Sequence, residues 1–147
     1  ACDDEVQIGI FTDLGRCCEN VTKWFSGCHA AFLEANYDEK MLSEGPYPYY
    51  LKQRISDGRG HLSNTIAHRL FTEYRSEHLT HLILSHLSEK NNSPLIVQQL
   101  FDSNSDGVNI IVAPRTEATP VYEITNGKHR EIKAGNYFQT SLFSDHT

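Results

Sequence analysis

Two identical tripeptides, His61-Leu62-Ser63 and His86-Leu87-Ser88, place histidines at two different kinds of position. His86 follows the apolar run 82–84, and a histidine just after a buried strand is well placed to bind a metal ion. His61 precedes a helical pattern, and a histidine at a helix entrance can donate a proton. Together with Asp13 upstream, the two histidines point to metal-assisted or acid–base chemistry.

Three apolar runs each end in a group that can bind a metal ion or carry a proton. These groups are Asp13 after residues 8–12, Glu34 after residues 31–33, and His86 after residues 82–85. Ligand sites gather at the carboxyl ends of parallel strands, so we expect the three groups to meet at one sheet edge. His61 would join them from a loop-to-helix junction. Carboxylates combined with imidazoles suit Zn²⁺, Mn²⁺ or Fe²⁺.

Each of these four residues also has a purely structural explanation. Asp13 can be a turn residue, and Glu34 can be a salt-bridged surface group. His86 can be a satisfied histidine at a strand end, and His61 can help to cap a helix. Convergence of all four at one place favours function over these alternatives, because unusual groups cluster at active sites.

The elements that must position these residues alternate between strands and helices. Strands are predicted over residues 6–12, 31–33, 82–84 and 108–112, with a C-terminal hairpin formed by 121–124 and 129–132. Helices are predicted over 19–25, 49–55, 64–74 and 94–101, with a helical turn over 38–43. This order predicts an α/β domain with a partly parallel sheet, and a loosely held tail follows residue 133.

The composition narrows the class of protein. The chain has 147 residues, 39% hydrophobic and 22% charged, as expected of one globular domain. No apolar run approaches the roughly 20 residues of a membrane span, so no membrane partner is expected. Four cysteines without zinc-type spacing and an acidic N-terminus predict reduced thiols and a cytoplasmic location. The net charge of −6 argues against broad electrostatic binding of nucleic acid, but a metal-centred nuclease remains possible because bound cations offset acidic ligands.

Six ordered blocks resemble the C-terminal half of metallo-β-lactamase-fold hydrolases, and most closely the bacterial WalJ-type exonucleases. The blocks are Thr12-Asp13-Leu14-Gly15, residues 33–38, residues 44–48, residues 51–55, Gly60-His61-Leu62-Ser63-Asn64 and residues 85–92. The resemblance implies an α/β fold that forms the C-terminal half of an αββα sandwich, with a mixed sheet flanked by helices. Residues 1–133 would form this partial domain and residues 134–147 a tail.

The resemblance also implies roles for the four central residues. Asp13 would be the carboxylate that bridges two divalent metal ions, Zn²⁺ or Mn²⁺, and His86 a ligand of the second ion. Glu34 and His61 occupy positions where related tRNA 3′-processing endonucleases carry a proton-shuttling pair. The implied reaction is two-metal hydrolysis of a phosphodiester in nucleic acid.

The basic and aromatic residues between positions 47 and 59 can each be interpreted in two ways, as contacts to nucleic acid or as structural residues. Lys52, Arg54 and Arg59 either contact phosphates or form a solvated helix face. Three tyrosines either stack on bases or pack the Pro-Tyr-Pro loop, and these are Tyr47, Tyr49 and Tyr50.

One part of the family's site is not encoded in this chain. The His-x-His-x-Asp-His motif of the N-terminal half is missing, since no two of the eight histidines are separated by a single residue. We therefore expect an incomplete metal site and no activity of the isolated chain. A half-sandwich would also expose one apolar sheet face, which predicts self-association or pairing with a chain that carries the missing half. Two alternatives stay open: a metal-free interaction module with relic ligands, and a hydrolase of lactones or thioesters.

Overall fold

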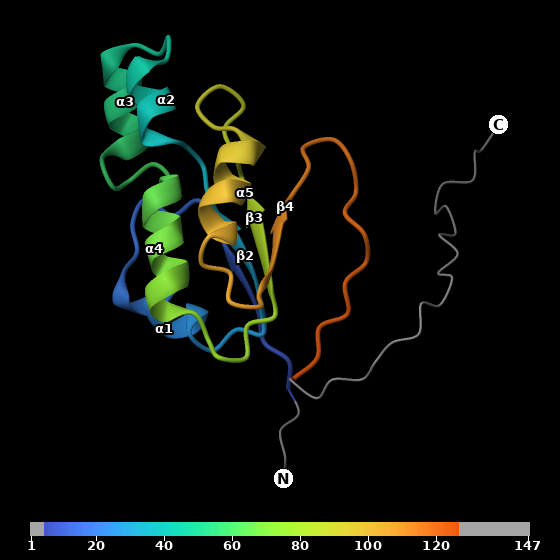
Figure 1. Cartoon of the computed structure of the whole chain (residues 1–147). Helices are drawn as coiled ribbons and strands as arrows, with labels where there is room; N and C mark the ends of the chain where they lie inside the picture. Colours follow the sequence, from blue (N-terminus) through green and yellow to red (C-terminus); the bar gives the residue numbers. More distant parts are fainter. Residues whose placement is uncertain (1–4, 127–147) are drawn as a thin grey trace, which may run out of the picture.

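A computed structural model describes residues 5–126 and shows a parallel four-stranded sheet (Figure 1). The strands are hydrogen-bonded in chain order and are β1 (Ile8–Phe11), β2 (Ala30–Glu34), β3 (His81–Ser85) and β4 (Asn109–Val112). The helices are α1 (Glu19–Phe25), α2 (Glu39–Glu44), α3 (Tyr49–Ser56), α4 (Asn64–Tyr74) and α5 (Pro94–Asp102). Helices α1, α4 and α5 cover one face of the sheet, and α2 and α3 lie beyond the carboxyl ends of the strands.

The core lies between the sheet and these three helices. Side chains alternate along each strand, so residues in register share a face. Phe11, Leu33, Leu84 and Val112 are in register and face the helices. They pack against the buried rings that the three helices contribute, which are Phe25, Phe71 and Phe101.

Local sequence signals fix the ends of several helices. The Ser63 hydroxyl accepts a hydrogen bond from the backbone N–H of Ile66 and caps α4. Asp38 caps α2 in the same way, and Pro94 occupies the first turn of α5, where its missing N–H costs nothing. The cap at Ser63 matters for the site, because it starts α4 directly after His61.

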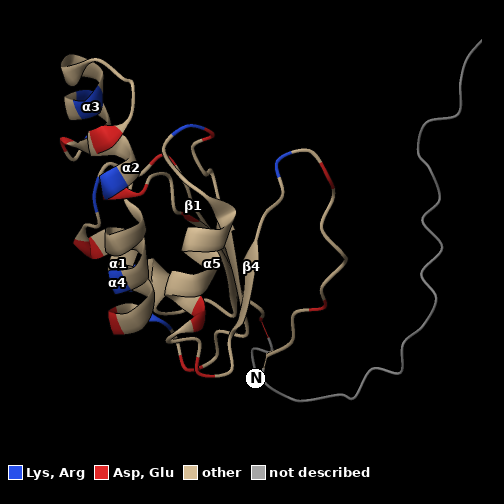
Figure 2. Cartoon of the chain, turned by 45° about the horizontal axis from the view of Figure 1, so that its top comes forward, with Lys and Arg blue, Asp and Glu red and all other residues tan. Residues whose placement is uncertain are grey.

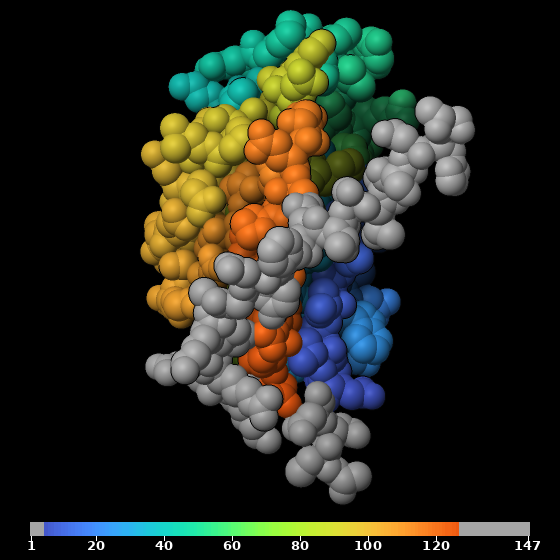
Figure 3. Space-filling view, turned by 90° about the vertical axis from the view of Figure 1, so that its right-hand side faces the viewer, coloured from blue at the N-terminus to red at the C-terminus, as the bar shows by residue number. Residues whose placement is uncertain are grey.

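The opposite face of the sheet is covered only in part by the described residues. The chain after β4 runs along this side in Figure 3, and the ring of Tyr122 lies 5.4 Å from the ring of His81. On this face Ile83 of the inner strand β3 is 7% exposed, whereas Ile10 on the edge strand β1 is 73% exposed and Phe32 is 38% exposed. The apolar surface expected on one sheet face is therefore found on its β1–β2 side.

The predicted α/β fold class is confirmed, with one correction in the sheet. Within residues 5–126 every strand pair is parallel, so the expected mixed sheet is not seen there. Residues 121–124 form no strand, because this segment packs across the sheet face through Tyr122 instead of pairing along an edge. The second hairpin strand at 129–132 and the boundary at residue 133 lie outside the described residues. No helix in the described part of the chain has the length and apolar character needed to cross a membrane.

Candidate metal centre

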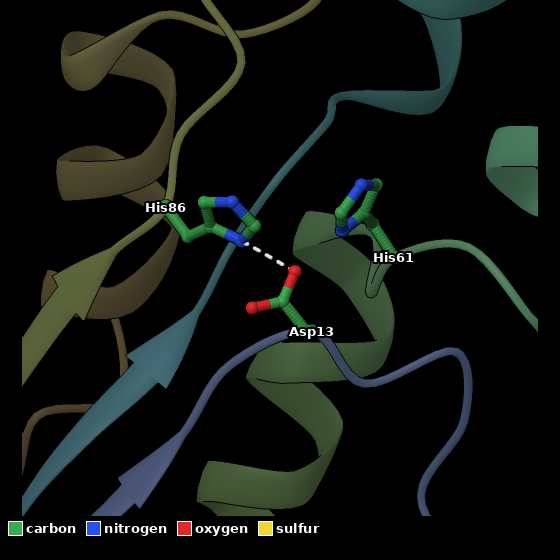
Figure 4. A group of neighbouring side chains, drawn as sticks. All are labelled: Asp13, His61 and His86. Carbon is green, nitrogen blue, oxygen red and sulfur yellow. Dashed lines mark ion pairs between the residues drawn. The ribbon is translucent and has the colours of Figure 1, made fainter.

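Two strand ends carry residues with unusual backbone conformations. Asp13, just after β1, has φ 56°, and His86, just after β3, has φ 58°. Residues other than glycine rarely adopt these left-handed values, and such strain is concentrated at functional sites. The two turns direct both side chains to the carboxyl edge of the sheet (Figure 4).

A buried carboxylate joins the two histidines. Glu34, the last residue of β2, is fully buried. Its Oε1 lies 2.7 Å from Nδ1 of His61 and 2.8 Å from Nδ1 of His86. Its Oε2 accepts hydrogen bonds from the backbone N–H groups of Leu14, at 2.9 Å, and Leu62, at 3.4 Å. Burial excludes the reading of Glu34 as a surface group.

This arrangement fixes which ring nitrogen of each histidine is free. An ionised carboxylate only accepts hydrogen bonds, so each Nδ1 carries the hydrogen that it shares with Glu34. Nε2 of His61 and Nε2 of His86 then remain available to bind a metal ion or to exchange a proton. A carboxylate behind an imidazole also makes Nε2 a stronger ligand.

Asp13 completes a compact group of donors. Its carboxylate lies between the two imidazoles in Figure 4, with Oδ1 3.9 Å from Nδ1 of His86. Asp13, His61 and His86 each offer one ligand atom within 4.8 Å of the others. Two imidazoles and one carboxylate are the donor types of many three-ligand divalent-metal sites, so these residue types suit one ion. Three donors are too few for two complete coordination shells.

Asn36 holds the backbone beneath the histidines. Its side-chain amide donates to the carbonyl oxygen of His86 at 2.7 Å, across 50 positions of sequence. Its backbone N–H donates to Leu62 at 3.0 Å, and its carbonyl accepts from the N–H of Ser88 at 2.8 Å. The nearby Asn92 side chain pairs with Asn64 and donates to the carbonyl of Ala35. Sequence reasoning missed Asn36, although it lies in the same block as Glu34.

The glycines Gly15 and Gly60 allow the loops that carry the site to meet. A Cβ at Gly15 would lie 2.3 Å from the carbonyl oxygen of Gly58, and a Cβ at Gly60 would lie 2.4 Å from that of Arg54. Both positions therefore require glycine for close backbone approach. The loop after β1 is thus held against the loop that leads into His61.

Of the three basic residues expected at the site, two lie beside it and one lies elsewhere. Arg54 and Arg59 line a cavity of about 660 Å³ together with Asp13 and His61. Lys52 lies elsewhere: its ammonium group donates to the carbonyl of Ser43 at 2.6 Å, and it lines a different cavity beside α2.

The three tyrosines also lie in different places, and one of them is close to the histidines. Tyr47 lines a cavity of about 380 Å³ that contains both His61 and His86. Tyr49 and Tyr50 project from α3 and are 73% and 72% exposed. Tyr49 lines the same cavity as Lys52, away from the histidines.

Comparison with known proteins gives three relatives and no matching family model. The chain is 29% identical over 106 residues to exodeoxyribonuclease YycJ of Bacillus anthracis, which covers 69% of this chain and 40% of that protein. It is 30% identical over 89 residues to exodeoxyribonuclease WalJ from two strains of Streptococcus pneumoniae, covering 60% of this chain and 33% of each. The chain thus spans well under half the length of the curated relatives that it matches. These similarities confirm the resemblance to the WalJ-type exonucleases of the metallo-β-lactamase fold.

Proposed function

We propose that this chain provides part of the active site of a metal-dependent nuclease that hydrolyses phosphodiester bonds. The observation that carries the proposal is the Glu34 carboxylate, which holds His61 and His86 beside Asp13 at one edge of the sheet. The similarity to exodeoxyribonucleases YycJ and WalJ supports this reaction.

Asp13 and His86 would hold a divalent ion through the Asp13 carboxylate and Nε2 of His86. When bound, such an ion lowers the pKa of a coordinated water and offsets the charge of the phosphate. Glu34 orients the His86 ring through Nδ1 and removes its rotational freedom. Asp13 and His86 would supply two donors to this ion, and water or further protein groups would supply the others.

His61 would protonate the departing oxygen from Nε2. Its Nδ1 stays hydrogen-bonded to Glu34, which holds the ring with Nε2 free to face the departing oxygen. Arg54 and Arg59 would contact phosphate groups from the cavity that they share with Asp13 and His61. The position of Lys52 removes it from this set.

Metal titration of the 147-residue chain tests the proposal. Isothermal titration calorimetry with Zn²⁺ and with Mn²⁺ should show binding that Asp13→Asn or His86→Ala abolishes. The matched control is His78→Ala, since His78 is exposed and stacks on His29 in a separate cluster. Absence of binding under all conditions would instead support the metal-free interaction module.

His61→Ala separates the two possible uses of His61. A proton donor can be lost without a large change in metal affinity, whereas loss of a ligand weakens binding as His86→Ala does. Hydrolysis itself is tested in a longer protein that carries the missing ligands. There, His61→Ala should lower turnover of a DNA substrate and leave metal content unchanged. Cleavage of lactones or thioesters in place of DNA would favour the alternative substrate class.

We further propose that the chain by itself associates with a second copy through the β1–β2 side of the sheet. Ile8, Ile10 and Phe32 form an exposed apolar row there, and the described residues do not cover them. In a solution of this chain alone, a second copy is the partner able to bury such a row. Light scattering should show a dimer that Ile10→Lys dissociates, while Leu95→Lys on the exposed side of α5 leaves it intact. A stable monomer of the unmodified chain would contradict this.

A further inference from the structure

The fourth strand also ends in a charged residue at the site. The backbone N–H of Ala113 donates to the carbonyl of Leu84 at 2.8 Å, which extends the pairing of β4 beyond Val112. Arg115 follows two residues later. The carboxyl ends of all four strands therefore supply a polar side chain to the same edge, and Arg115 is the contribution of β4.

Arg115 is held beside His86 by a specific contact. Its Nη2 donates to the carbonyl oxygen of Leu87 at 3.1 Å, so the guanidinium lies next to the loop that begins at His86. A guanidinium carries five N–H donors in a planar fork, and this contact uses one of them. The other donors match the oxygens of a phosphate group.

Arg115 borders two cavities that both contain His86. One, of about 380 Å³, also contains His61 and Tyr47. The other, of about 610 Å³, lies on the far side of His86 along the loop after β3 and the segment after β4. Arg54 and Arg59 line the cavity on the Asp13 and His61 side. Figure 2 shows basic positions on α3 and on the segment that leaves β4, on either side of the sheet edge.

We propose that Arg115 binds a phosphate of the nucleic-acid strand on the His86 side of the site, opposite Arg54 and Arg59. The inference rests on the proposed nuclease function and adds a path for the nucleic-acid strand. The strand would pass over the two histidines, from Arg54 and Arg59 on one side to Arg115 on the other. Because the chain as a whole has a net charge of −6, the phosphates would be attracted by these individual arginines and not by the overall charge of the protein.

The test is the salt dependence of binding of a fluorescein-labelled single-stranded DNA to the 147-residue chain in the presence of Mn²⁺. Each phosphate contact adds about 0.7 to the slope of log affinity against log salt for a single strand. Arg115→Gln and Arg54→Gln should each lower the slope by roughly that amount. Arg115→Lys keeps the charge and should keep the slope. Lys23→Gln near the end of α1 is the matched control and should change nothing.

The outcomes separate the two proposals. A slope lowered by Arg54→Gln but unchanged by Arg115→Gln overturns the role of Arg115 and leaves the nuclease proposal standing. No DNA binding by the unmodified chain overturns the Arg115 contact and counts against the nuclease proposal as well. Arg115 is exposed, so thermal unfolding of Arg115→Gln should match that of the unmodified chain and exclude misfolding as the cause.

Discussion

The Oε1 atom of Glu34 lies 2.8 Å from Nδ1 of His86, although 52 positions of sequence separate the two residues. The same oxygen contacts Nδ1 of His61, so one buried carboxylate sets the orientation of both imidazoles. The oxygens of this carboxylate contact the two histidines and two backbone N–H groups, so Glu34 is not itself a metal ligand. It acts by positioning the residues that are.

Replacing Glu34 by Gln should disturb both histidines at once. Gln keeps the shape, but its NH₂ group must face either the imidazole N–H groups or the backbone N–H groups of Leu14 and Leu62. We expect a loss of about 1–3 kcal/mol in unfolding free energy, and metal affinity lower by about 10–100-fold. Urea unfolding and calorimetric metal titration measure the two effects. Glu73→Gln on the exposed side of α4 is the control, and equal metal affinity in both variants would refute the role of Glu34.

Asn36→Asp tests whether the amide of Asn36 maintains the left-handed turn at His86. The substitution is isosteric but replaces the N–H donor by an oxygen opposite the His86 carbonyl. The unpaired carbonyl should cost about 1–3 kcal/mol of stability, and metal binding should weaken because His86 leaves its turn. Asn109→Asp, at the exposed start of β4, serves as comparison. If metal affinity falls only in proportion to the loss of unfolding free energy, in Asn36→Asp as in Asn109→Asp, then Asn36 is only a structural residue.

The sequence predicted most of the fold because its strands and helices carry strong periodic signals. Residues 64–74 show both an apolar face and the Ser63 cap, and α4 has these bounds. The apolar runs before Asp13, Glu34 and His86 indicated the sheet edge at which these residues lie. Residues 121–124 alternate like a strand, which is why a strand was predicted there, but Tyr122 packs on His81 and these residues form no strand. The second strand of the predicted hairpin lies outside the described residues.

The details of the site were harder to predict because they depend on contacts between distant segments. No local pattern reveals that Glu34 contacts both histidines, or that Asn36 reaches His86. Lys52 and Arg54 are two positions apart on one helix and so point to different sides, which separates Lys52 from the site. Arg115 was missed because its position becomes meaningful only when β4 lies beside β3.

The stability of the chain should fall in mild acid because of His68. Burial lowers the pKa of His68, and a hydrogen bond with Asn104 offsets part of this effect. Its Nε2 is buried without a partner. The folded state therefore disfavours the proton, so stability is full above the unfolded pKa of about 6.5 and decreases as the pH falls below it. Urea unfolding at pH 7.5 and pH 5.0 should show a smaller loss for His68→Gln than for the unmodified chain. His78→Gln is the control, and an unchanged loss in His68→Gln would exclude His68 as the source.

Gly15→Ala should separate the loop that carries Asp13 from the loop that leads to His61. The new Cβ would lie 2.3 Å from the carbonyl oxygen of Gly58 and 2.5 Å from Cα of Arg59, and backbone atoms cannot yield as a flexible side chain can. We expect metal affinity to fall, because Asp13 moves away from the histidines while the sheet and the α4 core stay intact. Gly27→Ala is the matched control, since its Cβ would meet the flexible end of the Gln7 side chain at 2.9 Å and the Trp24 carbonyl oxygen at an ordinary contact distance of 3.8 Å. Circular dichroism checks that both variants fold, and calorimetry measures metal binding. Unchanged affinity in a folded Gly15→Ala variant would show that close contact between these two loops is not what brings Asp13 to the histidines.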